Sequence, residues 1–136
     1  MSKLATIVTA GIISQQGKIL LVRRAAHKSQ AGCWEFPGGK LEVAETPQQC
    51  LMRELYEELS IRVEVGELFF RNHFSVNDNL FCLLSYRVNY LSGQFRFIDH
   101  DLMTWTTPLC LSKYPLSPAD IEVANHIKSC YKIGVF

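Results

Sequence analysis

Residues 38–61 read GGKLEVAETPQQCLMRELYEELSI, and the second half of this stretch has the spacing of an amphipathic helix. Thr46 can cap the helix, Pro47 suits its first position, and Gln49 stands at the capping-box distance from Thr46. Apolar side chains then recur at helical spacing and form one stripe: Leu51, Met52, Leu55 and Leu59. The pattern predicts a helix that ends near Ser60.

Three acidic side chains lie beside this stripe. Glu54, Glu57 and Glu58 follow the spacing i, i+3 and i+4, which places them on one narrow helix face. Such a group of like charges is costly unless a cation sits among them, and carboxylate oxygens suit Mg²⁺, with Mn²⁺ as the second choice. Arg53 could brace one of these carboxylates or Glu45. A solvated acidic helix face is the alternative that three glutamates alone leave open.

The whole stretch resembles the Nudix box, whose pattern is GX5EX7REUXEEXGU with U aliphatic. Gly39, Glu45, the run 53–58 and Ile61 stand at the matching positions. Ser60 departs from the pattern, because the box has a glycine there that ends the helix in a left-handed conformation. Serine at this position costs about 1 kcal/mol but replaces no catalytic group, so the departure concerns the geometry of the helix end.

The resemblance extends to residues 22–24, 31–40 and 114–120, which look like the MutT-type branch and are most similar within it to bacterial CTP pyrophosphohydrolases. It implies a Nudix fold over one domain, residues 1–136. This α/β (α+β) fold has a mixed β-sheet sandwiched between helices in an α/β/α arrangement, with the active site on a loop–helix–loop.

The resemblance also implies roles for the box residues. The metal ion, Mg²⁺ or alternatively Mn²⁺, would be held by Glu54, Glu57 and Glu58 with the Gly38 carbonyl. The catalytic residues would be Arg53, Glu54 and Glu57, with Glu54 or a later acid orienting or deprotonating the water. Attack at the β-phosphorus would then release pyrophosphate and a nucleoside monophosphate.

Asp99 and His100, which precede Trp105 in the sequence, each have two possible roles. Asp99 stands where similar enzymes place a further metal-binding acid, yet a turn aspartate explains it equally well. His100 is expected to be a loop residue or a neighbour of the metal ligands rather than the catalytic base. Trp34 and Trp105 are expected to pack in the interior.

Four residues are candidates for contacts with the substrate. Arg24 matches a phosphate-contacting arginine, and Lys40 could meet phosphate oxygens or remain solvated. Phe36 could stack on a base or pack in the core. Asp120 could accept a hydrogen bond from the amino group of cytosine, or it could stabilise a helix that Ser117 caps.

The rest of the chain reads as strands around a second helix. Strands are expected at 4–14, 19–22, 61–65, 68–75, 80–91 and 102–106, with a turn at 15–18 and a hairpin turn at 76–79. Residues 25–34 and 36–39 read as loops. A final helix begins at Pro118, and its inward face is expected to carry Ile121, Ala124, Ile127 and Cys130.

Composition limits the remaining possibilities. Of 136 residues, 48% are hydrophobic and 20% charged, and a net charge of +1 argues against a broad nucleic-acid surface. The five cysteines are scattered without a CxxC pair, which favours free thiols in a reducing compartment. The sequence has neither a signal-peptide pattern nor an 18-residue apolar run, so we expect a cytoplasmic protein.

The function expected from these observations is that of a Mg²⁺-dependent nucleoside triphosphate pyrophosphohydrolase. CTP, dCTP or a modified pyrimidine nucleotide is the first choice of substrate, because Asp120 favours amino-bearing bases. An enzyme of nucleotide-pool sanitation and DNA repair that hydrolyses 8-oxo-dGTP is the second. A non-catalytic nucleotide-sensing module is the third, although such a module is expected to lose box glutamates. We expect a small nucleoside triphosphate as partner, no nucleic-acid polymer or membrane, and a monomer or homodimer.

Overall fold

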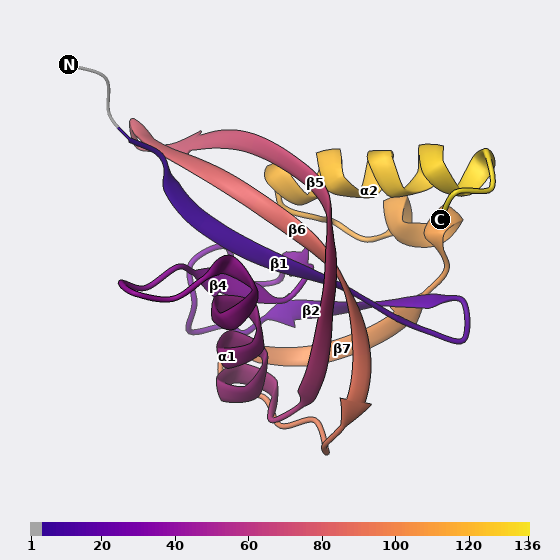
Figure 1. Ribbon diagram of the computed structural model, residues 1–136, viewed down its shortest axis with the longest axis horizontal. Helices are drawn as coiled ribbons and strands as arrows, with labels where there is room; N and C mark the ends of the chain where they lie inside the picture. Colours follow the sequence, from indigo (N-terminus) through magenta and orange to yellow (C-terminus); the bar gives the residue numbers. More distant parts are fainter. Residues whose placement is uncertain (1–3) are drawn as a thin grey trace.

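The computed structural model describes residues 4–136, which form one mixed sheet and two long helices (Figure 1). The elements are β1 (Thr6–Gln15), β2 (Lys18–Arg24), β3 (Trp34–Glu35), β4 (Gly38–Lys40), α1 (Pro47–Leu59), β5 (Arg62–Val76), β6 (Asn79–Ser92), β7 (His100–Thr106), the 3₁₀ helix η1 (Pro108–Lys113) and α2 (Pro118–Lys132). The strand order is β3-β2-β1-β6-β5, with β4 paired to β1 and β7 paired to β2. Only the β1–β6 pair is parallel among these strands.

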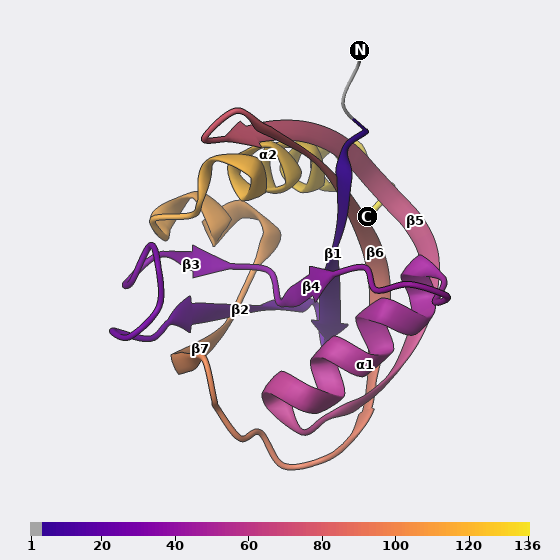
Figure 2. The same cartoon turned by 90° about the vertical axis from the view of Figure 1, so that its left-hand side faces the viewer.

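The sheet separates two layers of core. Successive side chains of a strand point to opposite faces, and in β2 Ile19 and Leu21 pack with α2 whereas Leu20 and Val22 pack with α1. Figure 2 shows the two helices on either side of the strands. The expected mixed sheet between helices is confirmed.

Two hairpin turns follow the sequence signals. Gln16 and Gly17 have φ of 52° and 77°, and Asn77 and Asp78 have φ of 50° and 65°. Asparagine, aspartate and glycine adopt this left-handed backbone at low cost and join antiparallel strands tightly. Both predicted turns are confirmed.

The sheet is more continuous than the sequence pattern predicted. The segments 61–65 and 68–75 belong to a single strand, β5, whose register with β6 shifts between Val65 and Leu68. The predicted loop at 36–39 contains the start of β4, because residues 38–40 pair with β1. Such pairings join distant segments, and local residue patterns do not reveal them.

The inward face of α2 was predicted correctly at Ala124 and Ile127 but wrongly at Ile121. Ile121 is 46% exposed, whereas Val123 is fully buried together with Ala124 and Ile127. Val123 and Ile127 are four residues apart, so they define a stripe that leaves Ile121 at its edge. Cys130, the other residue expected to face inward, is only partly buried.

Two further observations concern the state of the cysteines and the apolar character of the helices. All five cysteines are free, and Cys50 and Cys82 are buried. Across residues 4–136, the helices lack the combination of length and apolar character needed to cross a membrane.

Candidate active site

Helix α1 begins and ends as its sequence predicted. The Thr46 hydroxyl accepts a hydrogen bond from the Gln49 amide (3.1 Å), and the Gln49 side chain accepts one from the Thr46 amide (2.9 Å). Ser60 follows the last helical residue with φ 58° and ψ 33°, the left-handed conformation that the box glycine would adopt. The buried face of α1 carries Cys50, Leu51, Leu55 and Leu59.

Arg53 lies at the centre of a group of carboxylates. Its guanidinium makes two hydrogen bonds to Glu45 (2.8 and 3.1 Å), one to Glu54 (2.9 Å) and one to Glu57 (3.1 Å). It also donates to the Lys40 carbonyl (3.3 Å). The hydrogen bond from Arg53, helped by the Glu42 amide, lowers the pKa of Glu45 to about 2. Arg53 thus ties the loop before α1 to the acidic face of the helix.

Glu58 lies in a crowded acidic environment. Burial raises its pKa to about 8, and the negative charges of Glu54, Asp99 and Glu35 add to the effect. Carboxylates gathered in this way favour protonation or a bound cation. Hard oxygen donors of this number suit Mg²⁺ or Mn²⁺ better than a soft metal, so the residues present fit a hard divalent cation.

Glu54 and Glu57 are turned toward Arg53, so the three glutamates of α1 are not grouped around a common point. Among the residues that the structure describes, no three His, Cys, Asp or Glu side chains converge closely enough to hold a metal ion. Glu54 and Glu57 would have to exchange their hydrogen bonds with Arg53 for contacts to the cation. Both bonds are made by Nη1 of Arg53, while Nε and Nη2 grip Glu45. The loop would therefore stay anchored during that exchange.

The paired glycines join this acidic group to strand β4. A Cβ on Gly39 would collide with the carboxylate of Glu54, and a Cβ on Gly38 would collide with the backbone of Thr9. Glycine at 39 therefore lets Glu54 of helix α1 lie against β4, and glycine at 38 lets β4 lie against β1.

Asp99 and His100 lie at the start of β7, on the other side of the acidic group. The Asp99 carboxylate is 3.4 Å from His27 Nε2 and 3.8 Å from Lys28 Nζ, and it is close enough to Glu58 to raise that residue's pKa. His100 is buried, with its Nε2 2.8 Å from a Glu35 carboxylate oxygen. His100 is therefore a buried neighbour of the acids.

Glu35 is the site residue that sequence reasoning missed. Its carboxylate accepts hydrogen bonds from Arg24 (3.3 Å) and contacts His100, and its charge raises the pKa of both Glu58 and Asp120. The only signal in the sequence was a charged residue inside the otherwise apolar run 33–39. Its partners lie on distant segments, so the run alone did not mark it.

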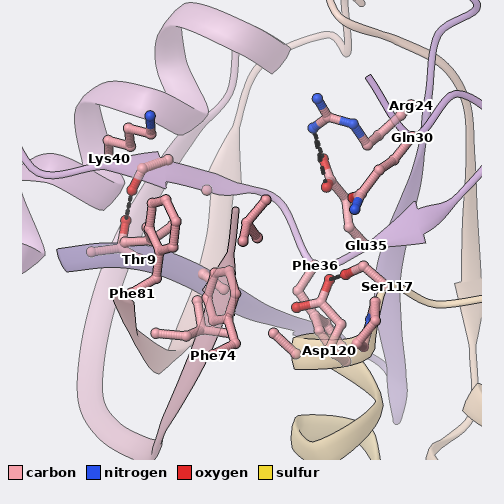
Figure 3. A pocket seen from close by; sticks show the side chains of 18 of the residues that line it. Thr9, Arg24, Gln30, Glu35, Phe36, Lys40, Phe74, Phe81, Ser117 and Asp120 are labelled. Atoms are coloured by element: carbon pink, nitrogen blue, oxygen red, sulfur yellow. Dashed lines mark hydrogen bonds and ion pairs between the residues drawn. The ribbon is translucent and has the colours of Figure 1, made fainter. Parts of the chain in front are cut away.

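A cleft of about 710 Å³ lies between β1, β4, the β5–β6 hairpin and the start of α2 (Figure 3). It collects the predicted substrate-contacting residues from four segments: Arg24, Phe36, Lys40 and Asp120. One end, at Arg24, Glu35 and Asp120, is charged. The other end is aromatic, with Phe74 and Phe81 stacked at 5.0 Å and Lys40 5.8 Å from the Phe81 ring centroid. Gly38 and Gly39 line the cleft as well, so it meets the acidic group across β4.

Asp120 is buried in the first turn of α2, at 6% exposure. Burial, and next the charge of Glu35, raise its pKa to about 7, while the Ser117 hydroxyl and the Phe36 backbone act in the opposite direction. Ser117 occupies the predicted cap position, but its hydroxyl donates to Asp120 (3.1 Å) and does not cap the helix. The carboxyl group faces the cleft in Figure 3.

Phe36 and Arg24 line the cleft and also make contacts within the protein. Phe36 is 3% exposed and belongs to the core, although one side of it lines the cleft. Arg24 also donates to the Ser29 carbonyl (2.7 Å). Trp34 packs edge-on against Tyr114 at 5.1 Å, in agreement with the expected packing role.

Comparison with known proteins identifies the family of the chain. Residues 3–114 match the NUDIX domain family. The chain is 42% identical to a CTP pyrophosphohydrolase of Escherichia coli K12, covering 85% of this chain and 86% of that protein. It is 39% identical to an 8-oxo-dGTP diphosphatase of Haemophilus influenzae, covering 93% and 94%. The solution structure of the E. coli ORF135 protein superposes with a TM-score of 0.86 at 37% identity, covering 96% and 93%. The chain therefore belongs to the NUDIX family and is a Nudix hydrolase of the MutT type.

Proposed function

We propose that this Nudix hydrolase is a Mg²⁺-dependent nucleoside triphosphate pyrophosphohydrolase that acts on CTP, dCTP or a modified pyrimidine nucleotide. The observation that carries the proposal is the environment of Glu58: burial, and next the charges of Glu54, Asp99 and Glu35, raise its pKa to about 8 beside a nucleotide-sized cleft. The CTP pyrophosphohydrolase among the relatives supports the choice of substrate.

The acidic group would hold the metal ion. Glu54, Glu57 and Glu58 of α1 would bind it with the Gly38 carbonyl, and Asp99 would complete the set directly or through a water. A divalent ion bound there would neutralise phosphate charge and make a bound water more acidic. Mn²⁺ would serve as the alternative ion.

The chain's own groups would position the reaction. Arg53 holds Glu45 and steadies the acidic face of α1. Glu54, which touches both Arg53 and β4, would accept the proton of the attacking water. The water attacks the β-phosphorus, the bond from that phosphorus to the bridging oxygen of the α-phosphate breaks, and pyrophosphate and the nucleoside monophosphate leave.

The cleft would hold the rest of the nucleotide. Arg24 and Lys40 supply positive charge for phosphate oxygens, and Phe36 offers one side of its ring to the base. Asp120 in its ionised form accepts a hydrogen bond from the 4-amino group of cytosine. A small nucleotide is thus the proposed partner, rather than a nucleic-acid polymer or a membrane, and the five free thiols support a reducing, cytoplasmic location.

An oxidised-purine substrate such as 8-oxo-dGTP is the second candidate. With a pKa of about 7, Asp120 is partly protonated at neutral pH, and a protonated carboxyl group can also donate to an acceptor on a purine. The 8-oxo-dGTP diphosphatase among the relatives supports this alternative. A non-catalytic sensing role is disfavoured by the presence of all three box glutamates.

The test is an assay of pyrophosphate release over a panel of normal and oxidised nucleoside triphosphates with Mg²⁺. We expect CTP or a related pyrimidine nucleotide to give the highest kcat/KM. The Glu57→Gln variant should lose on the order of a hundredfold in kcat while it still binds nucleotide, because a metal ligand is lost. Glu67→Gln, on the exposed part of β5, is the charge-matched control. Equal turnover by Glu57→Gln and Glu67→Gln would contradict the assignment of the metal site.

A further inference from the structure

Two buried polar side chains meet beneath strand β4. Thr9 of β1 is 1% exposed and Cys50 of α1 is fully buried, and the Thr9 hydroxyl lies 3.5 Å from the Cys50 sulfur. Both occupy interior positions that an apolar side chain of similar volume could fill. A buried polar group is costly unless it is hydrogen-bonded, so their partners indicate what they do.

Their partners are the backbone carbonyls of β4. The Thr9 hydroxyl donates to the Gly39 carbonyl at 3.1 Å, as Figure 3 shows. The Cys50 thiol lies 3.3 Å from the Lys40 carbonyl and 3.6 Å from the Gly39 carbonyl. Burial raises the pKa of the thiol, so it keeps the proton that it donates. One residue from the sheet and one from the helix therefore hold the same short stretch of backbone.

This backbone also borders the acidic group. Gly38, whose carbonyl is a candidate ligand, directly precedes the two restrained carbonyls, and the Gly39 backbone packs against the Glu54 carboxylate. Arg53 donates to the Lys40 carbonyl as well, at 3.3 Å, which adds a third restraint, the second from α1. Cys50 and Arg53 thus connect β4 to α1, and Thr9 connects the same stretch to β1.

We propose that Thr9 and Cys50 are positioning residues that hold β4 between β1 and α1, so that the Gly38 carbonyl and Glu54 can bind the same divalent ion. The proposal rests on the metal site assigned under the proposed function. Neither side chain touches the ion or the substrate phosphates in this account. Removing a group that orients a metal ligand in this way commonly weakens metal affinity by tenfold or more.

The test measures Mn²⁺ binding directly, without nucleotide, from the electron paramagnetic resonance signal of free Mn²⁺. Cys50→Ala and Thr9→Val should each bind Mn²⁺ on the order of tenfold more weakly than the parental protein. Cys50→Ser, which retains a donor, should bind more tightly than Cys50→Ala. Cys82→Ala removes another buried cysteine, on β6, and should bind Mn²⁺ as the parental protein does. Thermal unfolding of each variant establishes that it is folded.

The double variant adds a second readout. If both residues restrain the same carbonyls, the loss of affinity in Thr9→Val/Cys50→Ala should differ from the product of the two single losses, because removing one donor changes what the other can hold. Parental affinity in both single variants would overturn the positioning role while leaving the metal site intact. Failure of the parental protein to bind Mn²⁺ would instead overturn the metal site, and this proposal with it.

Discussion

At the scale of single residues, the carboxylates of the site differ in pKa because their environments differ. Glu45 is hydrogen-bonded to Arg53 and has a pKa of about 2, whereas Glu58 is buried among other acids and has a pKa of about 8. Asp120, at the far end of the site, has a pKa of about 7 because it is buried. The same chemical group therefore serves as an anchor, a candidate metal ligand and a candidate base reader.

The raised pKa of Asp120 predicts a pH-dependent choice of base. If Asp120 reads the base as proposed, its ionised carboxylate would accept from the 4-amino group of CTP above pH 7, and its protonated form would donate to O4 of UTP below pH 7. The ratio of kcat/KM for CTP to that for UTP should therefore fall as the pH drops through about 7. Using the ratio cancels effects of pH on the shared metal site.

The Asp120→Asn variant is the control for this prediction. Asparagine does not titrate, so the ratio should become independent of pH. A ratio in the parental protein that stays constant from pH 6 to pH 8 would show that Asp120 stabilises α2 without reading the base.

At the scale of elements, α1 shows both a well-formed start and a strained end. The capping box of Thr46 and Gln49 satisfies amides of the first turn. Ser60 at the other end adopts φ 58°, a conformation that a residue with a Cβ reaches only at a cost. The left-handed turn directs the chain into β5, so the helix keeps this geometry despite the serine.

The Ser60→Gly variant should consequently be more stable. Removing the Cβ relieves the left-handed conformation, and we expect the free energy of unfolding to increase by about 1 kcal/mol in chemical denaturation. Ser75→Gly, a substitution in the extended strand β5, is the matched control and should destabilise instead. A Ser60→Gly protein less stable than the parent would contradict this account of the helix end.

At the scale of the whole molecule, the sheet brings together residues that no local pattern connects. Helix α1 was predictable because caps and apolar spacing act within one segment, and the hairpin turns were predictable for the same reason. Glu35 was missed because its partners His100 and Asp120 reach it only through strand pairing and the packing of α2. Ile121 was wrongly assigned to the inward face of α2 because Ile121 and Val123 are both strongly apolar and only the packed fold distinguishes them.

The acidic group also predicts how global stability depends on pH. Folding raises the pKa values of Glu58 and Asp120 above their ordinary values of 4.5 and 3.8, so between about pH 4.5 and pH 8 the native state binds more protons than the unfolded state. Without metal, the free energy of unfolding should therefore decrease as the pH rises through this range. Glu45 acts in the opposite direction below pH 4.5, where its stabilising charge is lost.

Added Mg²⁺ should reverse this decrease, because an ion bound by the ionised carboxylates stabilises the native state. Thermal unfolding from pH 5 to pH 8, with and without Mg²⁺, measures both effects. In the Glu58→Gln variant the metal-free decrease should be shallower and the gain from Mg²⁺ smaller. Stability that rises with pH in the metal-free protein would contradict the predicted environment of Glu58.

The proposed function requires this site to cleave a nucleoside triphosphate at the β-phosphorus with the help of a divalent ion. The most direct test is to incubate the protein with CTP and Mg²⁺ in ¹⁸O-labelled water and to identify the products by ³¹P nuclear magnetic resonance and mass spectrometry. We predict CMP and pyrophosphate, with the label in pyrophosphate and no turnover when the metal is chelated. Label in CMP, formation of CDP and orthophosphate, or turnover that survives chelation would contradict the account.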